Sequence, residues 1–512
     1  MRAAFLVLLL VGAAVAAVVV IGHDGAGAGD GRADDRPSVV IVVLDEFPSD
    51  ALIGPDGRID AARYPNFAAL AATSTWFRNG HTVYDSTFKA VPAILDGRLP
   101  RRGTAPDVRS HQPSIYHLMD RLGYGVVKVE SGSAVCPPRI CAGARTRRPG
   151  VLKRLAGGGR PARLHKWIGA IRKRARPTFY FHHALLPHEP WIYLPSGHQN
   201  RPSGNDPIEG INRPIGFHDA RLTDHNHLRH LLQVGYTDRQ LGLLMRRMRR
   251  TGIFDSSVLI VVADHGYSFE VGVQERRQVS ESNFEQVAAV PFFVKAPGQT
   301  EGRVDGTLAQ NIDVAPTVAD LLGTKVWWRH DGRSVFSAAA RARTRLAMPR
   351  RDFSRVISYG RAEFERRRER LRLWRAAKFG TGAQSELMFG DPWASAYRIG
   401  PHPELLGRRV PRLAAGEARA VMANAALAAD VDPTEEILPT RVTGRLVGGP
   451  PGTTRDLAVA VNGRIRAVGR SFHLRGRRAE FFSLLVPETA LRRGANAIRL
   501  LEVRSGGELA GL

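Results

Sequence analysis

The chain has 512 residues, 43% of them hydrophobic, and 74 Lys+Arg against 48 Asp+Glu give a formal net charge of +26. This length exceeds one compact unit and predicts one large and one small domain. The charge favours anionic partners such as phospholipid headgroups or cell-surface polymers, or it reflects Arg spread over solvated faces. No zinc-finger spacing or RNA-binding aromatic motif accompanies it, which argues against nucleic acid as a partner.

The first segment predicts export. Arg2 precedes an uncharged apolar run over residues 3–22, which has the roughly 20 residues of a membrane-spanning helix rather than the roughly 7–15 of a cleavable signal. We expect a single-pass anchor at 1–22 with Arg2 inside, and a flexible tether at 23–36. The remainder would lie outside the cell membrane. A small-residue cleavage site at 26–28 leaves a secreted product as the alternative.

From Pro37 onward the pattern is typical of an α/β domain. Apolar runs of this kind indicate buried parallel strands, and they lie at 39–44, 125–130, 178–182, 258–262 and 290–295. Helical patterns separate them, notably 227–250, whose Leu stripe predicts core packing and which Gly252 ends. We therefore expect a mixed, mostly parallel sheet flanked by helices over 37–335.

Two further regions follow. Residues 336–436 are expected to extend the first domain with helical and irregular structure. Their Arg-dense stretch at 341–378 predicts a solvated helix face or, alternatively, a contact with anionic lipid or polymer. Short alternating runs at 437–512 predict a small β-sandwich, and Asn462-Gly463 is a strong hairpin signal within it.

The two cysteines, Cys136 and Cys141, lie in a Pro-containing segment. Without a second Cys or His pair nearby they would make a poor zinc site, and in a cytosolic protein they could instead be a redox-active pair. In an exported protein a small disulfide loop is the favoured interpretation.

Two of the predicted strands end in acidic residues. The first runs into Asp45-Glu46, and the fourth runs through Ala263 into Asp264-His265. Ligands of open α/β sheets bind at the carboxyl ends of the strands, so these side chains are expected to share one site. Carboxylate, hydroxyl and imidazole ligands suit one Mn²⁺, Zn²⁺, Mg²⁺ or Ca²⁺ ion. A surface Asp-His pair without a metal is the alternative.

A hydroxyl residue ahead of a Pro-containing apolar helix stands in TVYDSTFKAVPAILDGRLP, residues 82–100. This segment resembles the nucleophile segment of the alkaline phosphatase/sulfatase superfamily, with Thr87 as nucleophile. The order Asp45, Thr87, Asp264-His265 is also similar to that superfamily. The resemblance covers residues 37–332 and implies an alkaline phosphatase-like fold and a metal-dependent hydrolase or transferase. Asp45, Thr87, Asp264 and His265 would bind the metal, because a Thr hydroxyl needs activation; Glu46 would ligate beside them or face the loop.

The segment FYFHHALLPHEPWIYLPSG, residues 179–197, is similar to the His-x-x-x-x-His-x-Pro segment of membrane-anchored phosphoethanolamine and phosphoglycerol transferases. That likeness implies that His188 contacts the transferred group or protonates the leaving oxygen, with His183 supporting it. Structural histidines are the alternative.

Four cationic residues are candidates for binding the anionic substrate. Arg276 and Arg277 follow the Asp-His motif where relatives place cationic or His residues, and a guanidinium suits a phosphoryl or sulfuryl group. Lys89 and Lys128 are weaker candidates for the same role.

The nucleophile segment departs from the formylglycine sulfatases, which need Cys or Ser, then Pro two positions on and Arg two beyond. Thr87 is followed by Phe-Lys-Ala-Val and cannot become formylglycine. This favours phosphate esters over sulfuric-ester hydrolysis, which stays the alternative. The missing Asp-x-x-x-His pair of two-metal relatives argues for one metal. A non-catalytic envelope protein that binds anionic polymers is the alternative from another class.

Overall fold

The structure is a computed structural model that describes residues 36–512 apart from 142–158, 203–205, 212–216, 274, 424 and 451. The expected anchor at 1–22 and nearly all of the tether at 23–36 lie outside the described residues. Among the helices that are described, none is long and apolar enough to cross a membrane.

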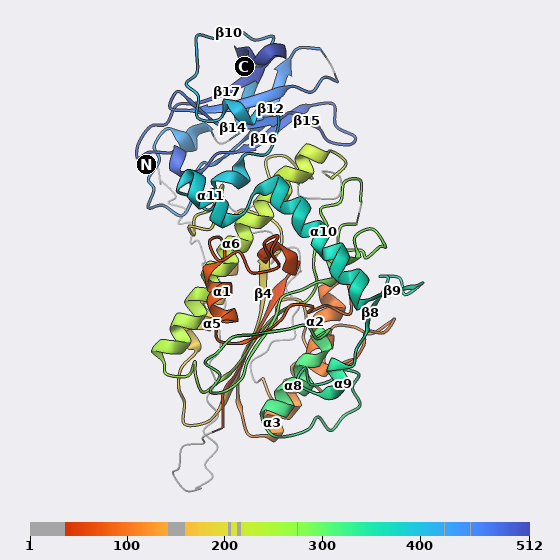
Figure 1. Cartoon of the computed structure of the whole chain (residues 1–512). Helices are drawn as coiled ribbons and strands as arrows, with labels where there is room; N and C mark the ends of the chain where they lie inside the picture. Colours follow the sequence, from red (N-terminus) through yellow and green to blue (C-terminus); the bar gives the residue numbers. More distant parts are fainter. Residues whose placement is uncertain are drawn as a thin grey trace, which may run out of the picture.

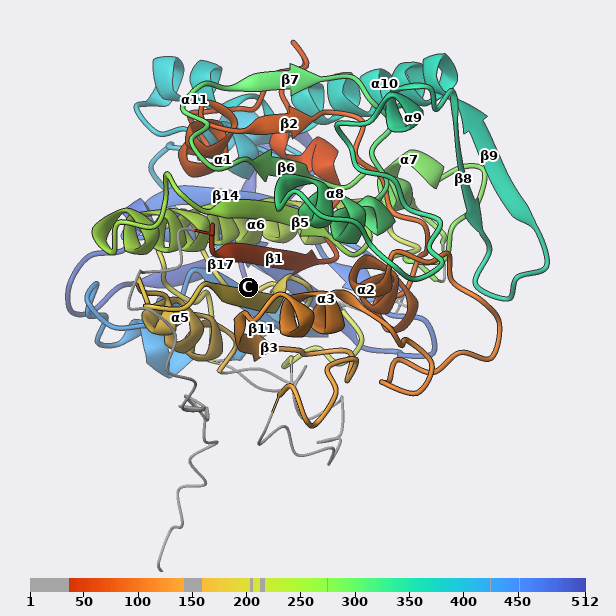
Figure 2. The ribbon, with the colours of Figure 1, turned by 90° about the horizontal axis from the view of Figure 1, so that it is seen from below.

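A seven-stranded sheet forms the centre of the larger part of the molecule (Figure 1). Figure 2 shows its strands in order from β7 at the top of the view to β3 at the bottom. In sheet order the strands are β3 (Gly125–Val129), β4 (Thr178–Pro187), β1 (Val39–Asp45), β5 (Val258–Ala263), β6 (Phe292–Lys295), β2 (Thr75–Phe77) and β7 (Arg303–Asp305).

The sheet is mixed and mostly parallel, as the apolar runs predict. Strands β3, β4, β1 and β5 are parallel, and only β6 runs against its neighbours β5 and β2. Every residue of β1, β4 and β5 is buried, as expected for strands covered on both faces. Strands β2 and β7 have three residues each, too few for a sequence pattern to indicate them.

Helices cover both faces of this sheet. Alternate residues of β1 enter two separate cores: Val40 and Val42 pack on one face, and Val39 and Ile41 on the other, as the two-residue period of a strand requires. The first face is covered by α1 (Pro65–Ala71), α5 (Arg160–Ala170) and α6 (Ala220–Arg250), and the second by α2 (Thr87–Asp96), α3 (Ile115–Arg121) and α8 (Val314–Leu321).

Helix α6 begins seven residues before the expected start at 227. The Asp219 side chain accepts a hydrogen bond from Leu222 N at 2.7 Å and so caps the helix. The first two turns of the helix are mostly polar, so the apolar pattern in the sequence did not indicate that the helix starts there. The helix ends as expected before Gly252, which adopts φ 71°.

The region expected to be helical and irregular also contains a two-stranded hairpin that the sequence pattern did not indicate. The hairpin is formed by β8 (Arg345–Pro349) and β9 (Val356–Gly360). The helices of this region are α9 (Ala338–Arg341), α10 (Arg361–Phe379) and α11 (Gly382–Phe389). The short helix α7 (Phe284–Ala288), which comes earlier in the chain, packs on α10.

The Arg-dense helix α10 is partly an internal structural element. Arg368 is 3% exposed and binds the buried Asp50 carboxylate, with Nε 2.9 Å from Oδ2. Arg375 is also buried and donates to the carbonyl of Ile53. Arg366 and Arg370 face solvent, so only part of the stretch is the solvated face that was expected.

The C-terminal part is a sandwich of two sheets, at the top of Figure 1. One sheet contains, in order, β10 (Ala414–Ala415), β18 (Leu509–Gly511), β17 (Ile498–Val503), β13 (Asp456–Val461) and β14 (Arg464–Arg470). The other contains β11 (Ala418–Ala423), β12 (Arg441–Gly448), β16 (Glu480–Leu485) and β15 (Phe472–His473).

The sandwich begins before the expected boundary at 437, because β10 and β11 belong to its sheets. Strand β10 has two residues, and the burial of β11 does not alternate, so neither gives a clear sequence signal. The expected hairpin joins β13 to β14. Its turn residues Asn462 and Gly463 both have positive φ, 51° and 78°, as a type I′ turn requires.

A buried ion-pair cluster ties the sandwich to the α/β part. Arg441 on β12 donates to both carboxylate oxygens of Asp206, at 2.7 and 3.1 Å. Burial alone would raise the pKa of Asp206, but Arg441, Arg229 and Arg201 outweigh it and hold the pKa well below its ordinary value. A lowered pKa contributes stability above the ordinary carboxyl pKa, and this is lost as pH falls toward the folded-state pKa.

Replacement of Asp206 by Asn is expected to destabilise the protein by about 3–5 kcal/mol at pH 7, because it removes the charge that neutralises buried guanidinium groups. Urea unfolding measures this, and the difference from wild type should shrink as the pH falls below about 4. Asp432→Asn is the matched control, because the Asp432–Arg493 pair is exposed and should matter little. Equal effects of the two substitutions would refute this role for the cluster.

Candidate active site

Two parallel strands bring the acidic strand ends together. Strands β1 and β5 pair in register from Val39↔Val258 to Leu44↔Ala263, so Asp45 and Asp264 emerge side by side at the carboxyl edge. Asp45 is 1% exposed and Asp264 is fully buried. Asp264 Oδ1 accepts backbone hydrogen bonds from Glu46 at 3.2 Å and from His265 at 2.6 Å.

Thr87 faces these strand ends as the first residue of α2. Its Oγ1 lies 3.4 Å from Asp45 Oδ1 and 3.2 Å from His265 Nε2. The other ring nitrogen of His265, Nδ1, lies 2.9 Å from the carbonyl oxygen of Gly266. A carbonyl only accepts, so Nδ1 carries the proton and the Nε2 lone pair points at Thr87 or at a metal.

His183 lies within β4 and pairs with Val43 of β1. Its Nε2 is 3.4 Å from Asp45 Oδ2 and 3.9 Å from Asp264 Oδ2. The sequence interpretation placed His183 at the substrate in support of His188, whereas the geometry groups it with the two carboxylates as a candidate metal ligand.

A second group consists of Asp45, Glu46 and His188. Glu46 adopts φ 59°, a left-handed conformation rare outside glycine, and its carboxylate is buried. Glu46 Oε1 lies 3.4 Å from His188 Nε2 and 3.3 Å from Arg277 Nη1. His188 Nδ1 donates to the Glu189 carbonyl at 2.6 Å, so Nε2 is the nitrogen that can exchange a proton at the site.

The site residues fit one divalent cation. Within the described part of the chain, no hydrogen-bond partner contacts Glu46 Oε2, Asp264 Oδ2 or His183 Nδ1, although all three atoms are buried. Burial and the nearby Asp45 charge raise the pKa of Asp264. Burial would also raise the pKa of Asp45, but His188, His183 and His265 outweigh it and lower that pKa. Crowded carboxylates with unsatisfied oxygens are the arrangement that a bound cation stabilises.

The four cationic candidates differ in their placement. Arg277 reaches Glu46 with a side chain that is 39% exposed. Arg276 binds Glu189 at 3.2 Å and lies over aromatic rings. Lys89 donates to the carbonyls of residues 101 and 104, and Lys128 lies 3.4 Å from a carboxylate oxygen of Glu130. Of these contacts, that of Arg277 with Glu46 lies within the site, whereas the ammonium group of Lys89 is engaged by loop carbonyls. Substrate binding by Lys89 stays a prediction.

Arg160 and Gln233 support the His188 loop, and the sequence interpretation missed both. Arg160 donates to the carbonyls of Leu185, His188 and Glu189. Gln233 donates to the carbonyl of His188 at 2.8 Å. Each is a single polar residue whose backbone partners carry no sequence signal, apart from the polarity of Gln233 within the apolar stripe of α6.

Asn311 connects the nucleophile segment to the end of β5. Its Nδ2 donates to Thr82 Oγ1 at 2.9 Å and to the carbonyl of Asp264 at 3.1 Å, and its Oδ1 accepts from Val83 N. The side chain is fully buried, so these bonds position the backbone behind Asp264 and ahead of Thr87.

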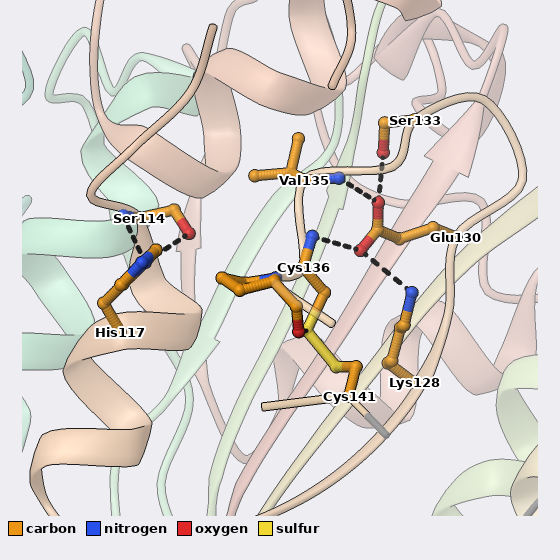
Figure 3. Close-up of a disulfide and its surroundings, with 9 residues drawn as sticks. Ser114, His117, Lys128, Glu130, Ser133, Val135, Cys136 and Cys141 are labelled. Atoms are coloured by element: carbon orange, nitrogen blue, oxygen red, sulfur yellow. Dashed lines mark hydrogen bonds and ion pairs between the residues drawn. A yellow bond between two sulfur atoms is a disulfide. The ribbon is translucent and has the colours of Figure 1, made fainter. Parts of the chain in front are cut away.

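The two cysteines form the expected disulfide, Cys136–Cys141 (Figure 3). The loop that leads to it is organised by the buried carboxylate of Glu130, which accepts from Ser133 Oγ at 2.9 Å, Val135 N at 2.8 Å and Cys136 N at 3.2 Å. Gly132 in this loop lies close to the side chains of Thr87 and His183.

Comparisons with known proteins show similarity to sulfatases and to a lipoteichoic acid synthase. The family model described as Sulfatase matches residues 162–324, the region that contains the two histidines and the Asp-His pair. A choline-sulfatase of Rhizobium meliloti is 23% identical over 363 residues, 56% of this chain and 68% of the relative. A lipoteichoic acid synthase of Staphylococcus saprophyticus is 29% identical over 98 residues, 17% of this chain and 14% of the relative.

Among solved structures, a phosphonate monoester hydrolase from Silicibacter pomeroyi aligns with a TM-score of 0.43 at 16% identity, covering 61% of this chain and 79% of that one. The chain spans only about a fifth of the length of an arylsulfatase K of Danio rerio that it also matches. The sequence matches and the ordered motifs together make the chain similar to sulfatase-like enzymes of the alkaline phosphatase/sulfatase superfamily.

Proposed function

We propose that the chain is a metal-dependent hydrolase or transferase that acts on phosphate esters through Thr87. The observation that carries this proposal is the position of Thr87 Oγ1, 3.4 Å from Asp45 Oδ1 and 3.2 Å from His265 Nε2. A Thr side chain has no route to formylglycine, so the hydroxyl itself is the group offered to the substrate.

Asp45, Asp264, His265 and Thr87 would hold one Mn²⁺, Zn²⁺, Mg²⁺ or Ca²⁺ ion, with His183 and Glu46 as further candidate ligands. When bound, the cation supplies positive charge that favours the ionised Thr87 hydroxyl and the anionic substrate. Arg277 adds a cationic group at the rim of the site, beside Glu46.

In the first step the ionised Thr87 oxygen, its proton already released to water, bonds to phosphorus. The bond from phosphorus to the leaving oxygen breaks, and His188 Nε2 gives that oxygen a proton. In the second step water or an acceptor alcohol attacks the phosphothreonine and passes its proton to His188. The Thr87 oxygen leaves, which restores the starting residues.

If His188 is the general acid, its contribution depends on the leaving alcohol. His188→Ala is expected to slow turnover of an alkyl phosphodiester by roughly 10²–10⁴-fold, the usual size of general acid–base catalysis. An aryl diester with an acidic phenol should be slowed far less, because its leaving oxygen needs little protonation. His198→Ala is the control, because His198 is not a site residue: its Nδ1 lies 2.7 Å from Glu488 Oε2. Equal loss on both substrates would contradict the acid role.

Sulfuric-ester hydrolysis is the second candidate, supported by relatives named choline-sulfatase and arylsulfatase K. Turnover of 4-nitrophenyl sulfate against bis(4-nitrophenyl) phosphate, both with saturating Mn²⁺, separates the two. We expect phosphodiester turnover to dominate by kcat/KM. A preference for the sulfate would reverse the assignment.

Residues 1–22 are proposed to anchor the enzyme in the cell membrane with the catalytic domain outside. The substrate would then be an anionic ester of the cell surface, such as a lipid or cell-wall polymer. Recovery of the full chain in the membrane fraction supports this proposal, and recovery only in the medium as a shortened chain supports the secreted alternative.

A further inference from the structure

Gly132 lies directly against Thr87. A Cβ atom built on Gly132 would be 2.6 Å from Thr87 Cγ2, whereas its next nearest neighbours, His183 Cε1 and Nδ1, would be at ordinary contact distances of 3.5 and 3.7 Å. Carbon atoms normally approach to roughly 3.5–4.0 Å. A Cβ atom at position 132 therefore conflicts with the Thr87 methyl group and not with His183.

The loop around Gly132 has little freedom to move away. Glu130 accepts three hydrogen bonds on the disulfide side of the loop. Ser131 Oγ donates to the carbonyl of His183 at 2.8 Å, and Ala134 N donates to the carbonyl of Pro106 at 2.8 Å. The contact with Thr87 is thus held from both sides of Gly132.

We propose that Gly132 is a positioning residue, whose missing side chain provides the space for the Thr87 methyl and thereby keeps Thr87 Oγ1 turned toward Asp45 and His265. This inference rests on the proposed function, in which Thr87 is the nucleophile.

The physical reason is the branching of Thr at Cβ. Cγ2 and Oγ1 are attached to the same carbon, so a rotation about χ1 that moves the methyl away from position 132 also moves the hydroxyl. Such a rotation would take Oγ1 out of its positions 3.4 Å from Asp45 Oδ1 and 3.2 Å from His265 Nε2. Glycine is not needed at position 132 for its backbone conformation, because Gly132 does not adopt a positive φ.

A double-mutant cycle tests the inference. Gly132→Ala is expected to lower kcat by roughly 10²-fold, the loss that a misplacement of about 1 Å produces. Thr87→Ser keeps the hydroxyl and removes the methyl, so in this background the added Gly132→Ala change should cost no more than about threefold in kcat, as a coupled pair predicts. Gly169→Ala, where a Cβ meets nothing within 4 Å, is the matched control.

A structure of the Gly132→Ala variant without substrate gives a second readout, with Thr87 expected in a different χ1 rotamer while its urea unfolding midpoint stays within the range of the control. Equal losses in the Thr and Ser backgrounds, or an unmoved Thr87, would overturn the inference. Failure of the proposed function is distinguishable, because Thr87→Ala would then retain turnover whatever stands at position 132.

Discussion

Thr87→Ala is expected to lower phosphodiester turnover by on the order of 10³-fold or more, the range found when a catalytic nucleophile is deleted. The substitution removes the only hydroxyl that contacts both Asp45 and His265 among the described residues. The start of α2 should be unaffected, because Ser86 and not Thr87 is its N-cap residue. The measurement is kcat for bis(4-nitrophenyl) phosphate at saturating Mn²⁺.

The matched control is Thr73→Ala, which removes a hydroxyl near the end of α1 that bonds only to helix carbonyls. Its kcat should equal that of wild type. If the Thr87→Ala enzyme keeps full turnover while metal-saturated, a water molecule rather than Thr87 is the nucleophile, and the phosphothreonine route is wrong.

Asp264→Asn is expected to weaken Mn²⁺ binding by at least roughly 10²-fold and to abolish turnover. The amide keeps an oxygen for the backbone bonds from Glu46 and His265, but it removes the charge that attracts the cation. Without metal, the variant should be no less stable than wild type, because one of two adjacent buried carboxylates is neutralised.

Unfolding with and without Mn²⁺ separates these effects. A ligand at 100 times its dissociation constant adds about 2.7 kcal/mol of stability, so wild type should be stabilised by Mn²⁺ and the variant should not. Asp120→Asn, at an exposed ion pair with Arg139, should respond to Mn²⁺ as wild type does. Equal Mn²⁺ stabilisation of the Asp264→Asn protein would exclude Asp264 as a ligand.

Much of the fold could be predicted because its central strands are buried on both faces. Such strands require uninterrupted apolar runs, and β1 and β5 have them. The acidic residues that end those runs also indicated the site edge, because parallel neighbours end together. The short strands β2, β7 and β10 have two or three residues, and pairing partners far along the chain define them, so no local pattern indicates them.

The site could be predicted less completely, because side-chain direction depends on contacts made by distant segments. Lys89 lies in the first turn of α2, two residues after the candidate nucleophile, yet its ammonium group donates to the loop carbonyls of residues 101 and 104. Arg160 holds the His188 loop by donating to backbone oxygens. Gly132 carries no side chain whose chemistry a sequence pattern could indicate. Its proposed role follows only from its closeness to the Thr87 methyl group in the folded structure.

The most direct test of the central claim is intact-mass and peptide mass spectrometry of enzyme quenched in acid during turnover of a phosphodiester with Mn²⁺. The phosphothreonine route predicts that wild-type peptide containing residue 87 carries the transferred phosphoryl group on Thr87, and that Thr87→Ala protein carries none. An unmodified Thr87 during rapid turnover, or a phosphoryl group on another residue, would contradict it.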